Sequence, residues 1–99
     1  MFGKLGEMKD MMGKLQEAQK ESQAMKQRLA QIELKEESEG LSVIVNGNKE
    51  IKDILIAEDL LKDGEELGDK LVLIINRALE KAQTVNDREM QSMATSMFK

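Results

Sequence analysis

The sequence predicts an α+β fold in the order α-β-β-β-α: a small antiparallel three-stranded sheet with two long projecting helices, paired in a homodimer. Three observations predict it. Apolar residues repeat every seven positions through the first third of the chain, as in helices that pack together. An Asn-Gly turn separates two short apolar runs in the middle, which is typical of a β-hairpin. Apolar residues at helical spacing fill the last third, and we expect residues 1–99 to form a single domain.

The first predicted helix spans about residues 5–30. Only Ser22 interrupts its heptad stripe of apolar residues. The stripe consists of Met8, Met11, Leu15, Ala18, Met25, Leu29 and Ile32. Such a stripe packs against another helix, from the same chain or from a partner. Three glycines, Gly3, Gly6 and Gly13, each disfavour the helix by up to about 1 kcal/mol relative to alanine, so we expect the first turns to fray.

Three strands are predicted between the helices. The first, about residues 32–38, alternates only weakly and has the polarity of an edge strand. The second and third, about residues 41–46 and 51–57, flank the turn Asn46-Gly47-Asn48-Lys49, in which asparagine and glycine readily take positive φ.

Both faces of this predicted hairpin are apolar, because successive strand residues point to opposite faces. In one strand Leu41, Val43 and Val45 oppose Ile44, and in the other Ile54 and Ile56 oppose Ile51 and Leu55. The helices of one chain need only one apolar face of the sheet. The second face therefore predicts a homodimer, since another subunit would cover it.

The second predicted helix spans about residues 65–96. Asp63, with Glu66 three residues later, is typical of a helix N-terminal cap. The apolar residues from Leu71 to Ala82 then recur at helical spacing. The five consecutive apolar residues 71–75 also fit a buried strand, but the cap before them and the helix-forming residues after them favour a helix.

The two helices are too long for a compact domain. Helices over residues 5–30 and 65–96 measure about 39 Å and about 48 Å. A compact chain of this size is only about 34 Å across. The helices must therefore project from the sheet, paired along part of their length, with an outer portion that faces solvent or a ligand.

The composition removes most catalytic and metal-binding chemistry. The chain has no histidine, cysteine, tyrosine or tryptophan, and so lacks general bases near neutral pH, thiol nucleophiles and the usual transition-metal ligands. The acidic stretch that begins at Glu58 fails the calcium-loop template, because Lys70 stands where the last carboxylate is required. We predict no enzyme activity, no cofactor and no metal.

Charge and hydropathy predict a cytoplasmic protein with no membrane partner. No apolar run approaches the roughly 18 residues of a membrane span, and the charged start lacks the apolar core of a signal peptide. The net charge is −4, but residues 36–66 hold 10 acidic and 3 basic residues, whereas the two flanks are slightly positive. Lysines scatter around the first helix, which fits either a solvated surface or local phosphate contacts.

Three segments carry a family resemblance. The start MFGKLGEMKDMMGKLQEAQ, the central VNGNKEIKDILI and the later INRALEKAQ resemble the YbaB/EbfC family of small bacterial nucleoid-associated proteins. The resemblance implies homodimers whose sheets associate while the long helices project like the arms of tweezers. It also implies non-catalytic binding of duplex DNA in the nucleoid, with little or flexible sequence preference, through residues of the arms. The candidate DNA contacts are Lys4, Lys9, Lys14, Lys20, Arg77, Lys81 and Arg88.

Two other hypotheses stand beside DNA binding. Two helices joined by a β-hairpin also resemble a prefoldin-like holding chaperone or protein-interaction adaptor, which would hold its clients with apolar residues at the helix ends. Those residues would be Met8, Met11, Met12, Met93, Met97 and Phe98. The simpler interpretation of these methionines is packing of helix on helix. A third hypothesis is a structural dimer that recruits a repair or replication protein.

Overall fold

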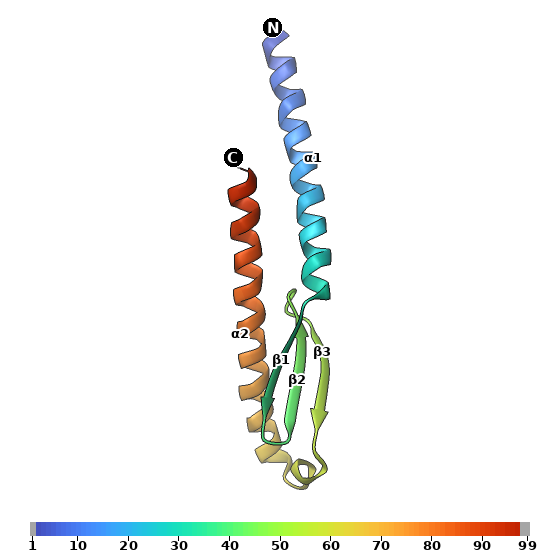
Figure 1. Cartoon of the computed structure of the whole chain (residues 1–99), viewed down its shortest axis with the longest axis vertical. Helices are drawn as coiled ribbons and strands as arrows, with labels where there is room; N and C mark the ends of the chain where they lie inside the picture. The colour runs from blue at the N-terminus through green and yellow to red at the C-terminus, as the bar shows by residue number, and fades with distance from the viewer. Residues whose placement is uncertain (1, 98–99) are drawn as a thin grey trace.

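A long helix, three strands and a second long helix follow one another along the chain, in the predicted order (Figure 1). The computed structural model describes the backbone of residues 2–97 and the side chains of residues 6–96. The elements are α1 (Phe2–Gln31), β1 (Glu33–Ser38), β2 (Leu41–Asn46), β3 (Ile51–Ile56), the short 3-10 helix η1 (Glu58–Lys62) and α2 (Gly64–Met97). The element η1 was not predicted.

Helix α1 runs without interruption through its glycines. Its backbone is helical from Phe2, and fraying of the first turns stays a prediction. Glycine lowers helix propensity but does not block the helical backbone, and the lysine, glutamate and methionine residues of the same turns are good helix formers.

The strands form one antiparallel sheet in the order β1-β2-β3. Residues directly opposite one another share a face, and the apolar pairs of β2 and β3 are Leu41–Ile56, Val43–Ile54 and Val45–Ile51. A β-bulge at Lys52 interrupts this register, because Ile44 pairs with Asp53 while Val45 pairs with Ile51. The bulge places Ile51 on the same face as the other two isoleucines of β3, which corrects its expected position on the opposite face.

Helix α2 packs along one face of the sheet and supplies half of the core. The buried cluster consists of Leu41, Val43, Val45, Ile74, Ala78 and Ala82. Its two alanines let the helix approach the sheet closely. The apolar run Leu71–Ile75 is helical, since Ile74 is buried while Val72 and Leu73 are 60% exposed, and this excludes the strand alternative.

Strand β3 lies outside the cover of α2. The helix packs on β1 and β2, because a helix about 10 Å wide spans two strands that are about 4.8 Å apart. Ile51, Ile54 and Ile56 face the helix side of the sheet but remain 37–46% exposed. The far face is mixed, with Lys35, Glu37, Ser42, Ile44, Asp53 and Leu55. The continuous uncovered apolar strip therefore lies on the helix side of β3. The far face, which the sequence predicts to be apolar, exposes Leu55 among polar residues.

The helices project well beyond the sheet. The chain measures 74 × 19 × 19 Å with a radius of gyration of 20.5 Å, against about 13 Å for a compact domain of this size. In Figure 1, α1 leaves one end of the sheet and rises past the C-terminal end of α2. Over the residues described, neither helix is long and apolar enough to cross a membrane.

Candidate nucleic-acid interface

Helix α1 presents lysines along its length. Lys9, Lys14 and Lys20 are exposed, and no ion pair joins any of them to another described side chain. Lys9 and Lys20 lie on one side of the helix, about 17 Å apart along its axis, and Lys14 lies on another side. The side chain of Lys4 is outside the described residues. The lysines of α1 therefore offer positive charge around the arm and do not form a single stripe.

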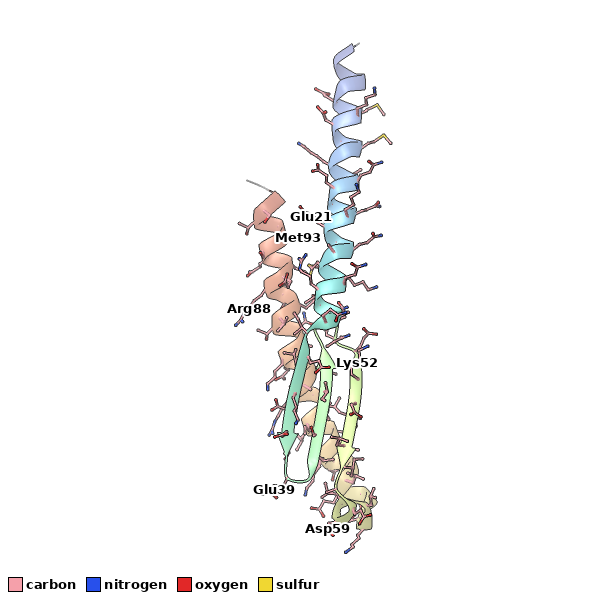
Figure 2. The ribbon with its side chains drawn as sticks, turned by 45° about the vertical axis from the view of Figure 1, so that its right-hand side comes forward. Glu21, Glu39, Lys52, Asp59, Arg88 and Met93 are labelled. Atoms are coloured by element: carbon pink, nitrogen blue, oxygen red, sulfur yellow. The ribbon has the colours of Figure 1, made fainter. Side chains whose placement is uncertain are left out.

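The basic residues of α2 fall on one face of the helix, the face toward β1. Their spacing of seven, four and seven residues aligns them, and they are Lys70, Arg77, Lys81 and Arg88. Lys81 is engaged, since its Nζ lies 2.5 Å from the carboxylate of Glu36 on β1 and donates a hydrogen bond to the carbonyl of Lys35 at 3.1 Å. Arg77 and Arg88 are exposed and form no ion pair with the described side chains, and Arg88 points away from α1 in Figure 2.

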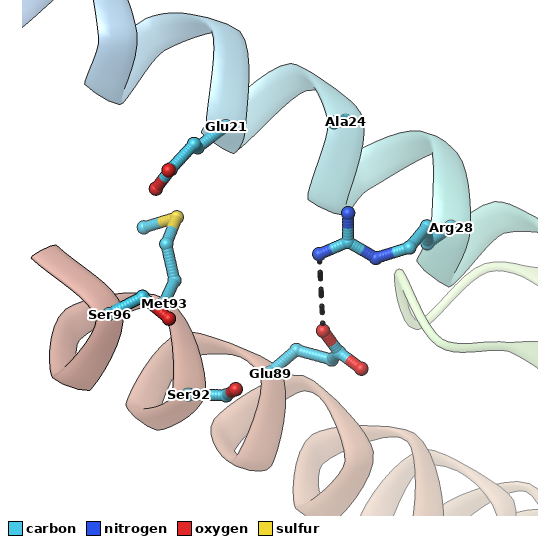
Figure 3. Close-up of a pocket in the computed structure, with 7 residues that line it drawn as sticks. All are labelled: Glu21, Ala24, Arg28, Glu89, Ser92, Met93 and Ser96. Atoms are coloured by element: carbon cyan, nitrogen blue, oxygen red, sulfur yellow. Dashed lines mark hydrogen bonds and ion pairs between the residues drawn. The ribbon is translucent and has the colours of Figure 1, made fainter.

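An open cleft of about 210 Å³ separates α1 from the C-terminal half of α2 (Figure 3). It is lined by Glu21, Ala24, Arg28, Glu89, Ser92, Met93 and Ser96. A single ion pair spans it, with 3.4 Å between Arg28 Nη2 and Glu89 Oε2. One guanidinium and the two carboxylates of Glu21 and Glu89 leave the cleft with a net negative charge. It does not suit a phosphate, so the available cations are those on the outer faces of the arms.

The methionines of the two helices divide into two groups. Met25 and Met93 are half-buried, and Met93 lines the cleft, as expected for packing of helix on helix. The apolar residues of the outer part of α1 are 61–64% exposed, and they are Met8, Met11, Met12 and Leu15. The side chains of Met97 and Phe98 are outside the described residues. The outer half of the heptad stripe thus packs against nothing in the part of the chain that the structure describes.

Three further lysines, which sequence reasoning did not single out, lie around the hairpin turn at the base of α1. They are Lys26, Lys49 and Lys52. Two of them act on Glu50: a hydrogen bond from Asn46, followed by the charges of Lys52 and Lys26, holds the pKa of the Glu50 carboxyl below its ordinary value. Lys26 lies near Lys49 and Lys52 only because α1 packs against the turn. No local sequence pattern predicts this proximity.

The opposite end of the molecule is acidic. Figure 2 shows Glu39 and Asp59 at the end farthest from the tip of α1. The acidic residues of this end are Glu37, Glu39, Glu58, Asp59, Asp63, Glu65 and Glu66. Asp63 caps α2 by accepting a hydrogen bond from the backbone N–H of Glu66 at 3.1 Å, as the sequence predicts. An acidic end repels a polyanion, so the arms are the part of the molecule that a polyanion approaches against the least repulsion.

Comparison with known families agrees with this geometry. A model of the YbaB/EbfC DNA-binding family matches residues 4–97. The chain belongs to the YbaB/EbfC DNA-binding family. The match covers nearly the whole chain and confirms the resemblance that the three sequence segments carry.

Two bacterial nucleoid-associated proteins and one solved structure are similar to this chain. A nucleoid-associated protein of Flavobacterium johnsoniae is 41% identical over 86 residues, which cover 85% of this chain and 81% of the relative. A nucleoid-associated protein of Nostoc punctiforme is 33% identical over 97 residues, or 96% of this chain and 84% of the relative. The crystal structure of an uncharacterized protein from Helicobacter pylori matches with a TM-score of 0.69 at 22% identity, covering 80% of this chain and 96% of that one. That likeness supports the shared fold.

The predicted contact residues of this YbaB/EbfC chain do not form one patch. Those on α1 surround the projecting arm, whereas those on α2 line the side of the helix that faces β1. Lys81 differs from the rest because its charge is already paired with Glu36. The sequence located the cations on the two arms but could not tell the engaged lysine from the free ones.

Proposed function

We propose that this chain binds duplex DNA as a homodimer in the bacterial nucleoid, without catalysis and with little or flexible sequence preference. The observation that carries the proposal is the distribution of unpaired cations. The exposed cations without an acidic partner among the described side chains include Lys9, Lys14, Lys20, Arg77 and Arg88. Those paired with a carboxylate are Arg28, Lys35, Lys62, Lys70 and Lys81. Free positive charge thus lies on the arms and, with Lys49 and Lys52, around the hairpin turn at the base of α1.

The binding mechanism is electrostatic. Lysine and arginine side chains on the arms replace the condensed counterions of the phosphate backbone, and the release of those counterions drives association. Contacts to phosphate carry no direct sequence information, which accounts for weak sequence preference. For a dimer that makes about 4–6 phosphate contacts, the logarithm of the affinity falls with the logarithm of the salt concentration at a slope of about −4 to −5.

A second copy of the chain supplies the cover that β3 lacks. The apolar strip of this strand comprises Ile51, Ile54 and Ile56. Val72 lies eleven residues before Gln83 and hence on the same side of α2, and Gln83 accepts a hydrogen bond from Lys49 in the β2–β3 turn. Val72 is therefore an exposed apolar neighbour on the β3 side. Two-fold pairing of this surface buries the same residues of both subunits and holds both pairs of arms on one body.

A salt-dependent titration tests the proposed function. Fluorescence anisotropy of a labelled duplex is measured with the wild-type chain at several salt concentrations, for two duplexes of unrelated sequence. We expect similar affinities for both duplexes and the steep salt dependence given above. Absence of binding at low salt would refute the proposal, and a large difference between the two duplexes would refute its lack of sequence preference.

Matched lysine variants locate the contacts. The triple variant Lys9→Gln, Lys14→Gln, Lys20→Gln is expected to weaken binding uniformly and to reduce the magnitude of the salt slope by about 2 to 3. The control is Lys62→Gln, because Lys62 lies at the acidic end, where it pairs with Asp59 at 3.6 Å. We expect the control to bind like the wild type. A loss in the control about one third as large as that of the triple variant would show that only total charge matters.

The exposed apolar residues of α1 favour a second candidate function, that of a holding chaperone. Met8, Met11, Met12 and Leu15 form an adaptable apolar surface on the outer arm. In this case the chain suppresses aggregation of a model client, and the triple variant Met8→Ser, Met11→Ser, Met12→Ser loses that activity while its DNA affinity is unchanged. A wild-type chain that does not suppress aggregation at equimolar concentration would exclude this candidate.

A further inference from the structure

Helix α1 is long and, over the part that the structure describes, contacts the rest of the chain only near its C-terminal end. It measures about 45 Å, and its contacts with α2 and β2 involve the turns from Glu21 to Gln31. Among the described side chains of this helix, Leu29 is the buried apolar one, with 1% of its surface exposed. The ion pair between Arg28 and Glu89 is exposed and long, and such pairs are worth at most about 1 kcal/mol. Another element must fix the direction of the arm.

The hairpin turn between β2 and β3 binds the end of α1. The backbone N–H of Gly47 donates to the carbonyl of Leu29 at 2.9 Å. This carbonyl is among the last four of the helix, which have no partner within it, and it also accepts from the backbone N–H of Ile32, just past the helix, at 3.2 Å. The side-chain amide of Asn48 donates to the carbonyl of Lys26 at 2.9 Å. Two donors of the turn therefore hold two carbonyls one helical turn apart, and together they set the axis of the helix.

The turn is itself held rigid and tied to the second helix. Asn46 is 1% exposed, and its side-chain oxygen accepts from the backbone N–H groups of Asn48 at 2.9 Å and Glu50 at 3.1 Å. From α2, the side-chain amide of Asn86 donates to the carbonyl of Gly47 at 3.3 Å. The turn thus contacts α1, the sheet and α2 at one place.

Gly47 is required here for space and not for backbone conformation. A Cβ at this position would lie 2.8 Å from Leu29 Cδ2 and 3.0 Å from the Leu29 carbonyl oxygen. The positive φ of the turn belongs to Lys49, at 65°, and φ of Gly47 is not positive. The expectation that the Asn-Gly pair supplies the positive φ is therefore wrong. The small size of Gly47 lets the end of α1 rest directly on the turn.

We propose that Gly47 and Asn48 are positioning residues for DNA binding: they fix the direction of α1 and so the places of Lys9, Lys14 and Lys20. This inference rests on the proposed function. Lys9 lies about 30 Å along the axis from Leu29, so a tilt of about 10° at the turn moves Lys9 by about 5 Å. A displacement of that size is many times the distance range of a phosphate hydrogen bond, about 0.5 Å, so the lysine side chain keeps its contact only by changing rotamer.

The test is Gly47→Ala with Gly13→Ala as its matched control. A Cβ at Gly13, on the same helix as Leu29, has no atom within 4 Å. Since the chain has no cysteine, Gln16→Cys on α1 and Gln91→Cys on α2 accept spin labels, and the distance between them is measured in labelled chains diluted with unlabelled protein. DNA titrations of the same two variants without labels complete the comparison.

Gly47→Ala is expected to shift or broaden the distance distribution, to weaken DNA binding about tenfold, and to reduce the magnitude of the salt slope by about 1 to 2. Gly13→Ala should change neither. A reduced salt slope distinguishes a misplaced arm from partial unfolding, which lowers the amount of active protein without altering the slope. Should Gly47→Ala not fold, Asn48→Ala removes only the donor to Lys26, and the same changes are expected in smaller size.

Two results would overturn the inference: an unchanged distance distribution in both turn variants, or an altered distribution with unchanged DNA affinity and slope. Failure of the proposed function itself looks different. In that case the wild type binds no DNA at low salt, while the distance measurement still reports whether the turn directs the arm.

Discussion

The two long helices of this chain are held in opposite ways. Helix α2 buries Ile74, Ala78 and Ala82 against the sheet, so its position is set by a packed core. Helix α1 buries Leu29 near its C-terminal end, and its outer heptad positions from Met8 to Leu15 face solvent. One helix is part of the folded body, whereas the other is carried by it.

This difference separates stability from binding. Residues of α2 that face the sheet contribute to the free energy of unfolding through burial, whereas the function proposed above assigns the exposed lysines of α1 to DNA affinity through charge. A substitution on one helix should therefore change one property and leave the other nearly intact. The following variants measure how far that separation holds.

The largest expected effect is on the free energy of unfolding, through the core between α2 and the sheet. Ile74→Ala removes a fully buried side chain that packs on β2, and we expect it to lower the free energy of unfolding by about 3 kcal/mol in urea titrations. Met11→Ala, on the exposed stripe of α1, should change it by less than about 0.5 kcal/mol. A loss above about 2 kcal/mol for Met11→Ala would mean that a partner subunit covers the outer arm.

The next effect concerns the partner of β3. Ile54→Lys places a charge in the uncovered apolar strip, and we expect the dimer to dissociate at least tenfold more readily, about 1.4 kcal/mol in association free energy. Leu55→Lys is the control, because Leu55 on the same strand is also exposed, 56% against 37% for Ile54, but points to the far face. Sedimentation at micromolar concentration measures both. Dissociation by Leu55→Lys alone would place the interface on the far face.

A smaller effect distinguishes the paired cation of α2, Lys81, from an unpaired one, Arg88. Lys81→Gln leaves the half-buried carboxylate of Glu36 without its partner, and we expect a loss of about 1 kcal/mol in unfolding free energy. Arg88→Gln breaks no ion pair among the described side chains, so it should leave stability unchanged and reduce the magnitude of the DNA salt slope by about 1. The opposite outcome, a stability loss in Arg88→Gln alone, would contradict the assignment of Lys81 as the engaged residue.

The smallest effect is a dependence on pH at the hairpin turn. The pKa of Glu50 lies below its ordinary value of 4.5, first because Asn46 donates a hydrogen bond to it and then because of Lys52 and Lys26. Since the folded-state pKa is below the unfolded one, ionised Glu50 stabilises the fold above about pH 4.5, and this contribution is lost as pH falls through the lowered pKa.

Glu50→Gln keeps an acceptor for Asn46 but does not titrate. Between about pH 5 and about pH 3 this variant should therefore lose less stability than the wild type does, as measured by urea unfolding at both values. Equal losses would show that the groups around Glu50 do not favour its ionised form.

Local patterns predicted much of this fold because each depends on residues that are close in the chain. The heptad repeat predicts α1, the Asn-Gly pair locates the hairpin turn, and Asp63 marks the start of α2. The same patterns located the cations of the two arms. They could not assign Ile51 to its face, because the bulge at Lys52 shifts the strand register only when β3 pairs with β2.

By itself, then, the sequence determined the order of the elements, the length of the arms and the family. Tertiary structure decided which cations are free, which apolar strip lacks cover, and what directs α1. The free cations are set by the contact between Lys81 and Glu36, and the direction of α1 is set by the packing of Leu29 against Gly47. The uncovered strip follows from the width of one helix packed over three strands. Each of these contacts joins residues that are distant in the chain, so it is determined by tertiary packing and not by local sequence patterns.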